Sequence, residues 1–336
     1  MLLSKINIRS IGLILLLPIA ITFASILDTA HPVELNTQPR MQKVGNSTQL
    51  TAISSDYSFQ QLIDGVVIRF ESDEQPTVEF RFLKKSGNWS DWQIGKVFKE
   101  SNTNRWLASN IDQIAKESIQ FEFQIYANKS DIRILEQGIF PVDNEIKTRS
   151  TLKPQIFPTE IPKPTIITRQ EWGARLPKRT TPINQYEYLT IHHAAGWPAS
   201  NLQEGKTAVK EIQDFHMDGR GWDDIAYHFL VDDAGNIYQG RSETLRGAHT
   251  LNWNNYNIGL CVLGCFDPPY EASAGIPCHQ HLTQEAKNSI VHLFSWLIDA
   301  YGYPNADLLK GHRDYYDFAH TSCPGQNIHQ LPVYPT

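Results

Sequence analysis

Short runs of alternating apolar and polar residues occupy the chain after residue 56. Clear examples are residues 66–70, 77–82 and 120–126, and turn-forming residues 85–88 separate two of these runs. Alternation with a period of two residues is typical of half-buried β-strands. The pattern therefore predicts a small all-β sandwich domain over residues 56–145.

A proline-rich segment follows this predicted sandwich. Pro154, Pro158, Pro162 and Pro164 fall within eleven residues, which is too dense for a helix or a central strand. We therefore predict an extended linker over residues 146–165. Residues 28–55, before the sandwich, are polar with little periodicity and are expected to form a leader.

Strand-like and helix-like patterns interleave in residues 166–336. We predict strands over residues 188–191, 227–231, 237–239 and 257–263, and helices over 208–216 and 283–300. The last helix has the clearest ends, because Thr283 suits the N-cap and Gly302 with Pro304 stops the helix. Interleaved strands and helices indicate an α/β domain.

The first 27 residues are predicted to be a signal peptide or a membrane anchor. Lys5 and Arg9 provide a positive start, and residues 10–27 carry no charge. Residues 22–24 suit signal cleavage, whereas eighteen uncharged residues just reach the length that spans a bilayer. Both alternatives predict an exported protein that works extracellularly, in the periplasm or at the cell wall, and the second adds a membrane tether.

Composition narrows the function further. Thirty Lys and Arg against thirty-six Asp and Glu give a net charge of −6, so no basic field attracts nucleic acid. Four cysteines in 336 residues are too few for a fold built on disulfides. Eleven of the twelve histidines and all four cysteines follow the linker, so residue types that bind metals concentrate in the second domain.

Three of these residues can supply a metal site. His192 ends a predicted strand, His312 lies in a loop, and Cys323 follows eleven residues later. Two imidazoles and a thiolate match a catalytic zinc site that leaves one position for water. The spacing alone leaves a second interpretation open, in which the histidines are hydrogen-bonded structure and the cysteine is a small apolar filler.

Six motifs in the second domain occur in an order that resembles a known family. They are EWGAR (171–175), IHHAAG (191–196), GWDDIAYHF (221–229), GAH (247–249), NIG (257–259), and GHRD (311–314) followed by CPG (323–325). Together they resemble the peptidoglycan recognition protein and type 2 N-acetylmuramoyl-L-alanine amidase family over residues 166–332. The resemblance implies a mixed central β-sheet flanked by helices, preceded here by the small all-β sandwich.

The resemblance also implies a function. In active family members, the positions of His192, His312 and Cys323 hold zinc, so we expect one Zn²⁺ per chain. The implied reaction is hydrolysis of the amide between N-acetylmuramic acid and L-alanine in peptidoglycan or muropeptides, by a monomer. The alternative is a non-catalytic recognition protein, but such members commonly lack the cysteine, so Cys323 favours catalysis.

Two further residues are predicted to be catalytic. Tyr227 occupies the position of a tyrosine that assists the reaction in the family, and its hydroxyl can donate a hydrogen bond to the developing oxyanion. The alternative is an aromatic side chain of the core. Thr321 occupies a position where some members carry a catalytic lysine and recognition proteins carry threonine, and it is expected to help place the substrate.

Four residues within the motifs are predicted to bind substrate: His249, Trp222, Arg313 and His193. For His249, a role behind the metal ligands is an equal alternative. The loop between His312 and Cys323 is longer than is usual in the family and contains His320. That histidine is expected to be solvated, ahead of a role as proton shuttle or substitute ligand.

The other cysteines and the tryptophans of the first domain remain open at this stage. Cys265 and Cys278 bracket a segment rich in proline and glycine, where a disulfide and free thiols are equal alternatives. Cys261 lies on an apolar strand and is expected to be a buried thiol. Three tryptophans form either a sugar-stacking face or part of the sandwich core, namely Trp89, Trp92 and Trp106.

Overall fold

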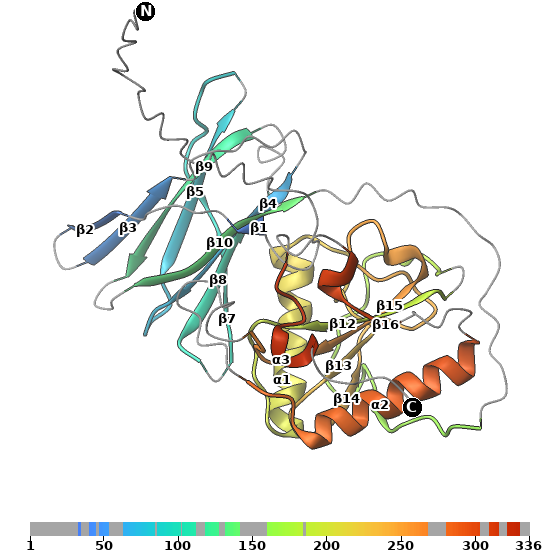
Figure 1. Ribbon diagram of the computed structural model, residues 1–336. Coiled ribbons are helices and arrows are strands. Elements are labelled where there is room, and N and C mark those ends of the chain that lie inside the picture. The colour runs from blue at the N-terminus through green and yellow to red at the C-terminus, as the bar shows by residue number, and fades with distance from the viewer. Residues whose placement is uncertain are drawn as a thin grey trace, which may run out of the picture.

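A β-sandwich and an α/β unit lie side by side in the protein (Figure 1). The computed structural model describes residues 33–34, 40–44, 47–53, 63–84, 86–101, 103–111, 118–127, 132–141, 160–183, 186–267, 280–302, 309–315 and 321–329. Among these residues, no helix has the length and apolar character needed to cross a membrane. The predicted signal peptide or anchor lies outside them.

The first part is an antiparallel β-sandwich, as predicted. One sheet has the strand order β1-β10-β4-β8-β7 and the other has the order β2-β3-β9-β5-β6. Alternate side chains such as Ile68, Phe80 and Phe123 fill the core between the sheets. The strands are β1 (Val33–Glu34), β2 (Arg40–Val44), β3 (Ser47–Ile53), β4 (Ile63–Glu71), β5 (Thr77–Lys84), β6 (Gln93–Ile94), β7 (Lys96–Lys99), β8 (Arg105–Asn110), β9 (Ser118–Ala127) and β10 (Arg133–Pro141).

The sandwich starts earlier than the hydropathy pattern indicates. Strands β1, β2 and β3 fall in residues 28–55, which were expected to form a leader. β1 and β2 lie at the ends of their sheets, and β2 pairs with β3 as an antiparallel hairpin. Backbone hydrogen bonds hold such strands and do not depend on side-chain polarity, so a polar segment can pair without showing apolar alternation.

The second part contains a six-stranded mixed sheet with the order β11-β14-β13-β15-β12-β16. β13 and β14 pair antiparallel, and the other neighbours pair parallel. This confirms the predicted α/β class. The strands are β11 (Ile166–Ile167), β12 (Tyr188–His193), β13 (Phe229–Val231), β14 (Ile237–Gln239), β15 (Asn257–Val262) and β16 (Leu309–Gly311).

Helices cover both faces of this sheet. On β15, Leu260 packs in the cluster that includes α2 (Gln284–Tyr301), while Cys261 packs in the cluster that includes α1 (Leu202–Asp214). Because successive strand residues point to opposite faces, α1 and α2 lie on opposite sides of the sheet. The short helices are the π-helix η2 (Phe215–Gly219), the 3₁₀ turns η3 (Asn254–Tyr256) and η4 (His312–Tyr315), and α3 (Gln326–His329).

The ends of α1 and α2 follow from their capping residues. The Thr283 hydroxyl accepts the amide N–H of Ala286 over 3.1 Å, and Gly302 ends α2 in the left-handed conformation, as predicted. α1 begins at Leu202, earlier than the predicted residue 208. The reason is Asn201, whose side chain accepts the N–H groups of residues 203 and 204 and so caps the helix there.

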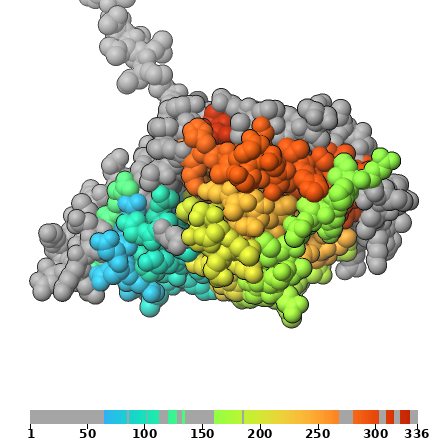
Figure 2. Space-filling view, turned by 90° about the horizontal axis from the view of Figure 1, so that it is seen from below, coloured from blue at the N-terminus to red at the C-terminus, as the bar shows by residue number. Residues whose placement is uncertain are grey.

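The sandwich packs directly against the α1 side of the α/β unit. Figure 2 shows the cyan atoms of the sandwich in contact with the yellow atoms of the α1 region. Val67 of β4 and Leu107 of β8 belong to the same apolar cluster as Val209 of α1. The two parts therefore share a hydrophobic interface in addition to the covalent linker.

Candidate metal centre

The parallel pairing of β12 and β16 brings His192 and His312 together. Ile191 of β12 lies opposite Gly311, the last residue of β16, and His192 and His312 follow directly after this pair. Residues in equal register of parallel strands point to the same face. The two imidazole rings accordingly lie with their centroids 4.4 Å apart, and both side chains are 0% exposed.

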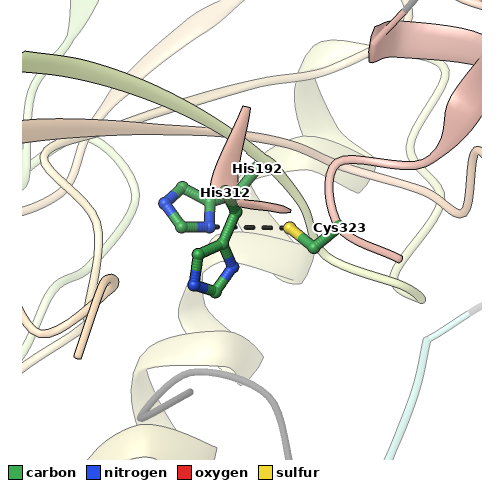
Figure 3. A group of neighbouring side chains, drawn as sticks. All are labelled: His192, His312 and Cys323. Atoms are coloured by element: carbon green, nitrogen blue, oxygen red, sulfur yellow. Dashed lines mark hydrogen bonds between the residues drawn. The ribbon is translucent and has the colours of Figure 1, made fainter. Parts of the chain in front are cut away.

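Cys323 reaches this pair from the turn before α3. Its Sγ lies 3.6 Å from Nδ1 of His192, and its side chain is buried. Figure 3 shows the sulfur pointing toward the two imidazole rings. One ligand atom from each of the three residues lies within 4.8 Å of the others. The structure thus brings together all three side chains that the sequence predicts as metal ligands.

The donor set and its spacing fit zinc. In a tetrahedral site, Zn–S bonds of about 2.3 Å and Zn–N bonds of about 2.0–2.1 Å separate sulfur from nitrogen by about 3.5 Å. The observed separation of His192 Nδ1 and Cys323 Sγ is 3.6 Å. Two imidazoles and one thiol also match the ligand types of zinc, which favours nitrogen and sulfur.

His249 determines which nitrogen of His192 faces the metal position. Nε2 of His249 lies 3.3 Å from the carbonyl oxygen of Asn257, which only accepts, so this nitrogen carries a proton. Burial lowers the pKa of His249 well below its usual value, so the ring is neutral and its Nδ1 accepts. Nε2–H of His192 donates to that Nδ1 over 3.1 Å. Nδ1 of His192 is then unprotonated and faces Cys323.

Tyr227 lies against the metal centre but is buried. Its ring centroid is 5.2 Å from that of His192, and the residue is 2% exposed. Burial raises the pKa of the Cys261 thiol, and a hydrogen bond with Tyr227 partly opposes that shift. Cys261 is a free, buried thiol, as predicted.

Arg313 and Thr321 support the turn that carries Cys323. The backbone N–H of Arg313 donates to the Cys323 carbonyl over 2.9 Å, and its guanidinium donates to the carbonyl of Ser322. The Cys323 N–H in turn donates to the Thr321 hydroxyl over 3.1 Å. Both predicted site residues therefore lie beside the third metal ligand and hold its backbone in place.

His193 belongs to a second group of possible ligands, together with Cys265 and Asp267. Cys265 is disulfide-bonded and so offers no thiolate. Burial lowers the pKa of His193 to about 3, so the ring is neutral, and its Nδ1 accepts the Phe266 N–H over 3.3 Å. Asp267 accepts the Ser322 hydroxyl over 2.9 Å. This group supports the Cys323 turn instead of forming a second metal site.

Trp222 is half-buried at the edge of the site, between two basic side chains. The Arg220 guanidinium lies 4.0 Å from its ring centroid, and the His216 ring lies 5.0 Å away. His216 was not singled out from the sequence. Its Nδ1 accepts the Ala226 N–H over 3.1 Å, and its ring lies 5.8 Å from that of Tyr227, so it helps to place the segment before β13. A buried histidine on a π-helix has no local sequence pattern that distinguishes it.

Two predicted features fall outside the described residues. His320 lies in the segment 316–320, and Cys278 lies in the segment 268–279. Of the three tryptophans considered for the sandwich, Trp106 is buried in the core, and Trp89 is 36% exposed. Trp89 and Trp92 flank the Arg81 guanidinium at 4.9 and 4.6 Å.

Comparison with known proteins matches the second part of the chain. The sequence profile of the family described as N-acetylmuramoyl-L-alanine amidase matches residues 182–326. Peptidoglycan-recognition protein SC2 of Drosophila simulans is 36% identical over 165 residues, which cover 49% of this chain and 82% of that protein. Human peptidoglycan recognition protein 3 is 32% identical over 191 residues, which cover 55% of this chain and 51% of that protein.

Among solved structures, wild-type Drosophila PGRP-LB is 26% identical, with a TM-score of 0.44 over 51% of this chain and 95% of that chain. The matching profile covers most of the α/β unit and includes His192, His312 and Cys323. The chain therefore belongs to the peptidoglycan recognition protein and type 2 N-acetylmuramoyl-L-alanine amidase family.

Proposed function

We propose that this chain is a zinc-dependent peptidoglycan hydrolase that cleaves the amide between N-acetylmuramic acid and L-alanine. One observation carries the proposal: His192, His312 and Cys323 converge with a sulfur-to-nitrogen separation that suits tetrahedral zinc. A member of this family that only recognises peptidoglycan has no need of a complete ligand set. The proposal includes export and action on the cell wall, because residues 1–27 have the pattern of a signal peptide or membrane anchor.

Zinc in this site supplies Lewis-acid activation of the amide carbonyl and of the attacking water. Neighbouring groups of the chain set the tautomer of His192 and the position of Cys323. His192 presents an unprotonated Nδ1 because its proton lies on Nε2, which donates a hydrogen bond to His249. Arg313 and Thr321 hold the backbone on either side of Cys323, so its sulfur keeps its place beside His192.

The reacting atoms of the substrate would lie at the fourth position of a tetrahedral zinc, which the three ligands leave free. We propose that Tyr227, whose ring packs against His192, donates a hydrogen bond from its hydroxyl to the developing oxyanion. Trp222, which is half-buried, offers an aromatic surface for the stem peptide. Buried His249 and His193 act from behind the ligands and the Cys323 turn, because both are at most 1% exposed.

Recognition without hydrolysis is the second candidate. It is favoured by the names of the matched relatives, which are peptidoglycan recognition proteins from fly and human. The two functions differ in one measurable product. An amidase creates free N-terminal L-alanine from intact peptidoglycan, whereas a recognition protein binds and leaves the polymer unchanged.

The test uses the mature protein with purified peptidoglycan. Zinc content is measured together with the release of new alanine N-termini, for the wild type and for Cys323→Ala. The matched control is Cys261→Ala, which removes the other free buried thiol of the described residues but leaves the ligand set intact. We expect stoichiometric zinc in the wild type and in the control, new termini in the wild type, and neither zinc nor new termini in Cys323→Ala. Binding to peptidoglycan with no new termini would replace the amidase proposal with recognition.

A further inference from the structure

One sheet of the sandwich is buried on both faces where it meets the α/β unit. Residues 65–70 of β4 are all buried. Val66 and Phe70 face the sandwich core, whereas Val67 between them joins the apolar cluster of α1. A strand at the surface of an isolated sandwich would alternate buried and exposed positions. The second face of β4 is instead built to be covered by the α/β unit.

Arg69 is the charged residue at the centre of this covered face. It is 6% exposed, and its Nε lies 2.8 Å from Oε1 of Glu100, which is 0% exposed. Its Nη1 donates to the carbonyl oxygen of Ala195 over 3.1 Å, across the boundary between the two parts. The guanidinium carbon lies 5.9 Å from the centroid of the Trp197 ring. Arg69 therefore contacts the loop formed by residues 194–197 at two places.

This loop has a backbone conformation that needs outside support. Ala195 and Trp197 have φ values of 51° and 50°, in the left-handed region that side chains other than glycine rarely adopt. Such residues persist when the surrounding structure holds them. Between them, Gly196 leaves room for the Glu100 carboxylate, because a Cβ on this glycine would lie 2.7 Å from Glu100 Oε2. The sandwich thus fills the space beside the loop with the Glu100 carboxylate, and its Arg69 donates a hydrogen bond to the Ala195 carbonyl.

The supported loop follows the first metal ligand directly. β12 ends at His193, and Ala195 is three residues beyond His192. The loop is also tied to the segment that follows β15, because the Gly264 N–H donates to the Gly196 carbonyl over 2.9 Å. A shift of this loop would therefore move the end of β12, on which His192 stands.

A second set of contacts leads from the sandwich toward Tyr227. The ring of Phe98 on β7 meets the ring of Phe215 edge to face at 5.4 Å, and the Ser109 hydroxyl donates to the Gly219 carbonyl over 2.9 Å. Phe215 and Gly219 are the first and last residues of the π-helix η2. The same π-helix carries His216, which accepts the backbone N–H of Ala226, next to Tyr227. The contacts of Arg69 thus lead to His192, and the contacts with the π-helix lead to Tyr227.

We propose that the β-sandwich is a positioning domain for the metal centre and that Arg69 is a positioning residue for His192, acting through residues 194–197. The inference rests on the proposed zinc site. A buried ion pair such as Arg69–Glu100 is weak as a source of stability, because removing two charges from water offsets much of their attraction. The contacts of Arg69 with Ala195 and Trp197 instead fix the position of residues 194–197 relative to the sandwich. The sandwich therefore acts on the site by direct contact.

The experiment measures zinc affinity in the full chain, by competition with a chelator, for the wild type, Arg69→Met and Arg69→Lys. Cobalt absorption of the Co²⁺-loaded proteins reports the ligand geometry, and thermal unfolding reports the fold. Arg69→Met keeps the apolar stem but loses the contacts to Glu100 and Ala195. We expect it to weaken zinc binding about tenfold, the lower end of the loss seen when support of a metal ligand is removed. We also expect its cobalt spectrum to change.

Arg69→Lys keeps the charge and one donor, so we expect it to recover part of the affinity. The matched control is Arg133→Met, which removes an arginine of β10 that pairs with Glu71 and is 54% exposed. This control should match the wild type. If Arg69→Met does not fold, Glu100→Gln, which keeps the shape of the side chain, should give a smaller loss in the same direction.

Wild-type zinc affinity and an unchanged cobalt spectrum in folded Arg69→Met, or in Glu100→Gln, would overturn the positioning role. That result differs from failure of the proposed function. Wild-type protein that binds no zinc would contradict the metal site itself. Wild-type protein that binds zinc but releases no alanine would contradict the amidase alone, and the comparison of zinc affinities would still decide the role of Arg69.

Discussion

His192 donates a hydrogen bond from Nε2 to Nδ1 of His249 over 3.1 Å, while its Nδ1 faces the sulfur of Cys323 at 3.6 Å. The two ring nitrogens of His192 thus have separate tasks, one toward the metal position and one toward the protein. A partner on the far nitrogen orients a histidine ligand and sets its tautomer. The neutral, buried His249 is suited to accept this hydrogen bond.

Replacement of His249 by alanine is expected to weaken zinc binding. His192 would lose the acceptor that orients its ring, and loss of such a partner typically lowers metal affinity by about 10-fold to 100-fold. The measurement is a competition titration with a chelator. The matched control is His292→Ala, which removes an exposed histidine of α2 and should leave the affinity unchanged. Equal affinity in the His249 variant and the wild type would contradict the orienting role.

Gly259→Ala is expected to disturb the same contact from the other side. A Cβ at this position of β15 would lie 2.6 Å from three atoms of the His249 ring, so the ring would have to move. We expect a folded protein with zinc affinity reduced by about tenfold. Circular dichroism and the chelator titration measure the two properties. A variant that folds and retains full affinity would show that His249 can shift without affecting His192.

Acid is expected to destabilise the zinc-free protein partly through His228. Burial lowers the pKa of this histidine to about 3, and its ring donates to the Leu245 carbonyl over 2.7 Å and accepts the Gly259 N–H over 3.0 Å. Its pKa in the unfolded chain is about 6.5. Between these two pKa values the unfolded state binds a proton that the folded state does not. The free energy of unfolding therefore falls as the pH drops below about 6.5, by about 1.4 kcal/mol per pH unit for this one group.

Urea unfolding of chelator-treated protein between about pH 7 and pH 5 measures this dependence. His228→Gln removes the titrating group, so its unfolding free energy should change less with pH than that of the wild type. The difference between the two slopes isolates His228 from the other groups that titrate. Identical slopes would mean that His228 takes up its proton in the folded protein as easily as in the unfolded chain.

Thr283→Ala is expected to lower the free energy of unfolding by about 1 kcal/mol, the usual cost of losing an N-cap side chain. Besides capping α2 through Ala286, the Thr283 hydroxyl donates to the Asp233 carbonyl over 2.6 Å. Urea unfolding measures the loss. Thr207→Ala, on the exposed side of α1, is the control and should stay within about 0.5 kcal/mol of the wild type. An equal loss of unfolding free energy in both variants would contradict the capping role of Thr283.

The fold class and the ends of α2 could be predicted because they depend on residues close together in the chain. Alternation with a period of two predicted the sandwich strands, and Thr283 and Gly302 predicted the ends of α2. Strands β1, β2 and β3 escaped the pattern, because backbone pairing holds them and their side-chain polarity does not reveal it. α1 begins earlier than predicted because Asn201 caps it, and the apolar stripe that predicts this helix does not extend to its first turn.

The three candidate metal ligands could be predicted by residue type and motif, since each stands in a short characteristic segment of the family. The register of Ile191 with Gly311 then explains why two of them meet. The contacts behind them were not decided by the sequence, which left two alternatives open for His249 and gave no signal for Arg69. His249 is 57 residues from His192, and Arg69 is 126 residues from Ala195. Contacts at such separations depend on how sheets and helices pack, and the hydropathy pattern does not predict them.

The amino-acid sequence by itself thus determined most of the elements, the family and the candidate ligand set, because periodicity, capping and motif chemistry are local properties. Only the tertiary structure decided which nitrogen of His192 faces the metal position, because that depends on the hydrogen bond to His249. It also decided that the sandwich contacts the loop behind His192. That contact depends on a buried arginine whose partners come from both parts of the chain.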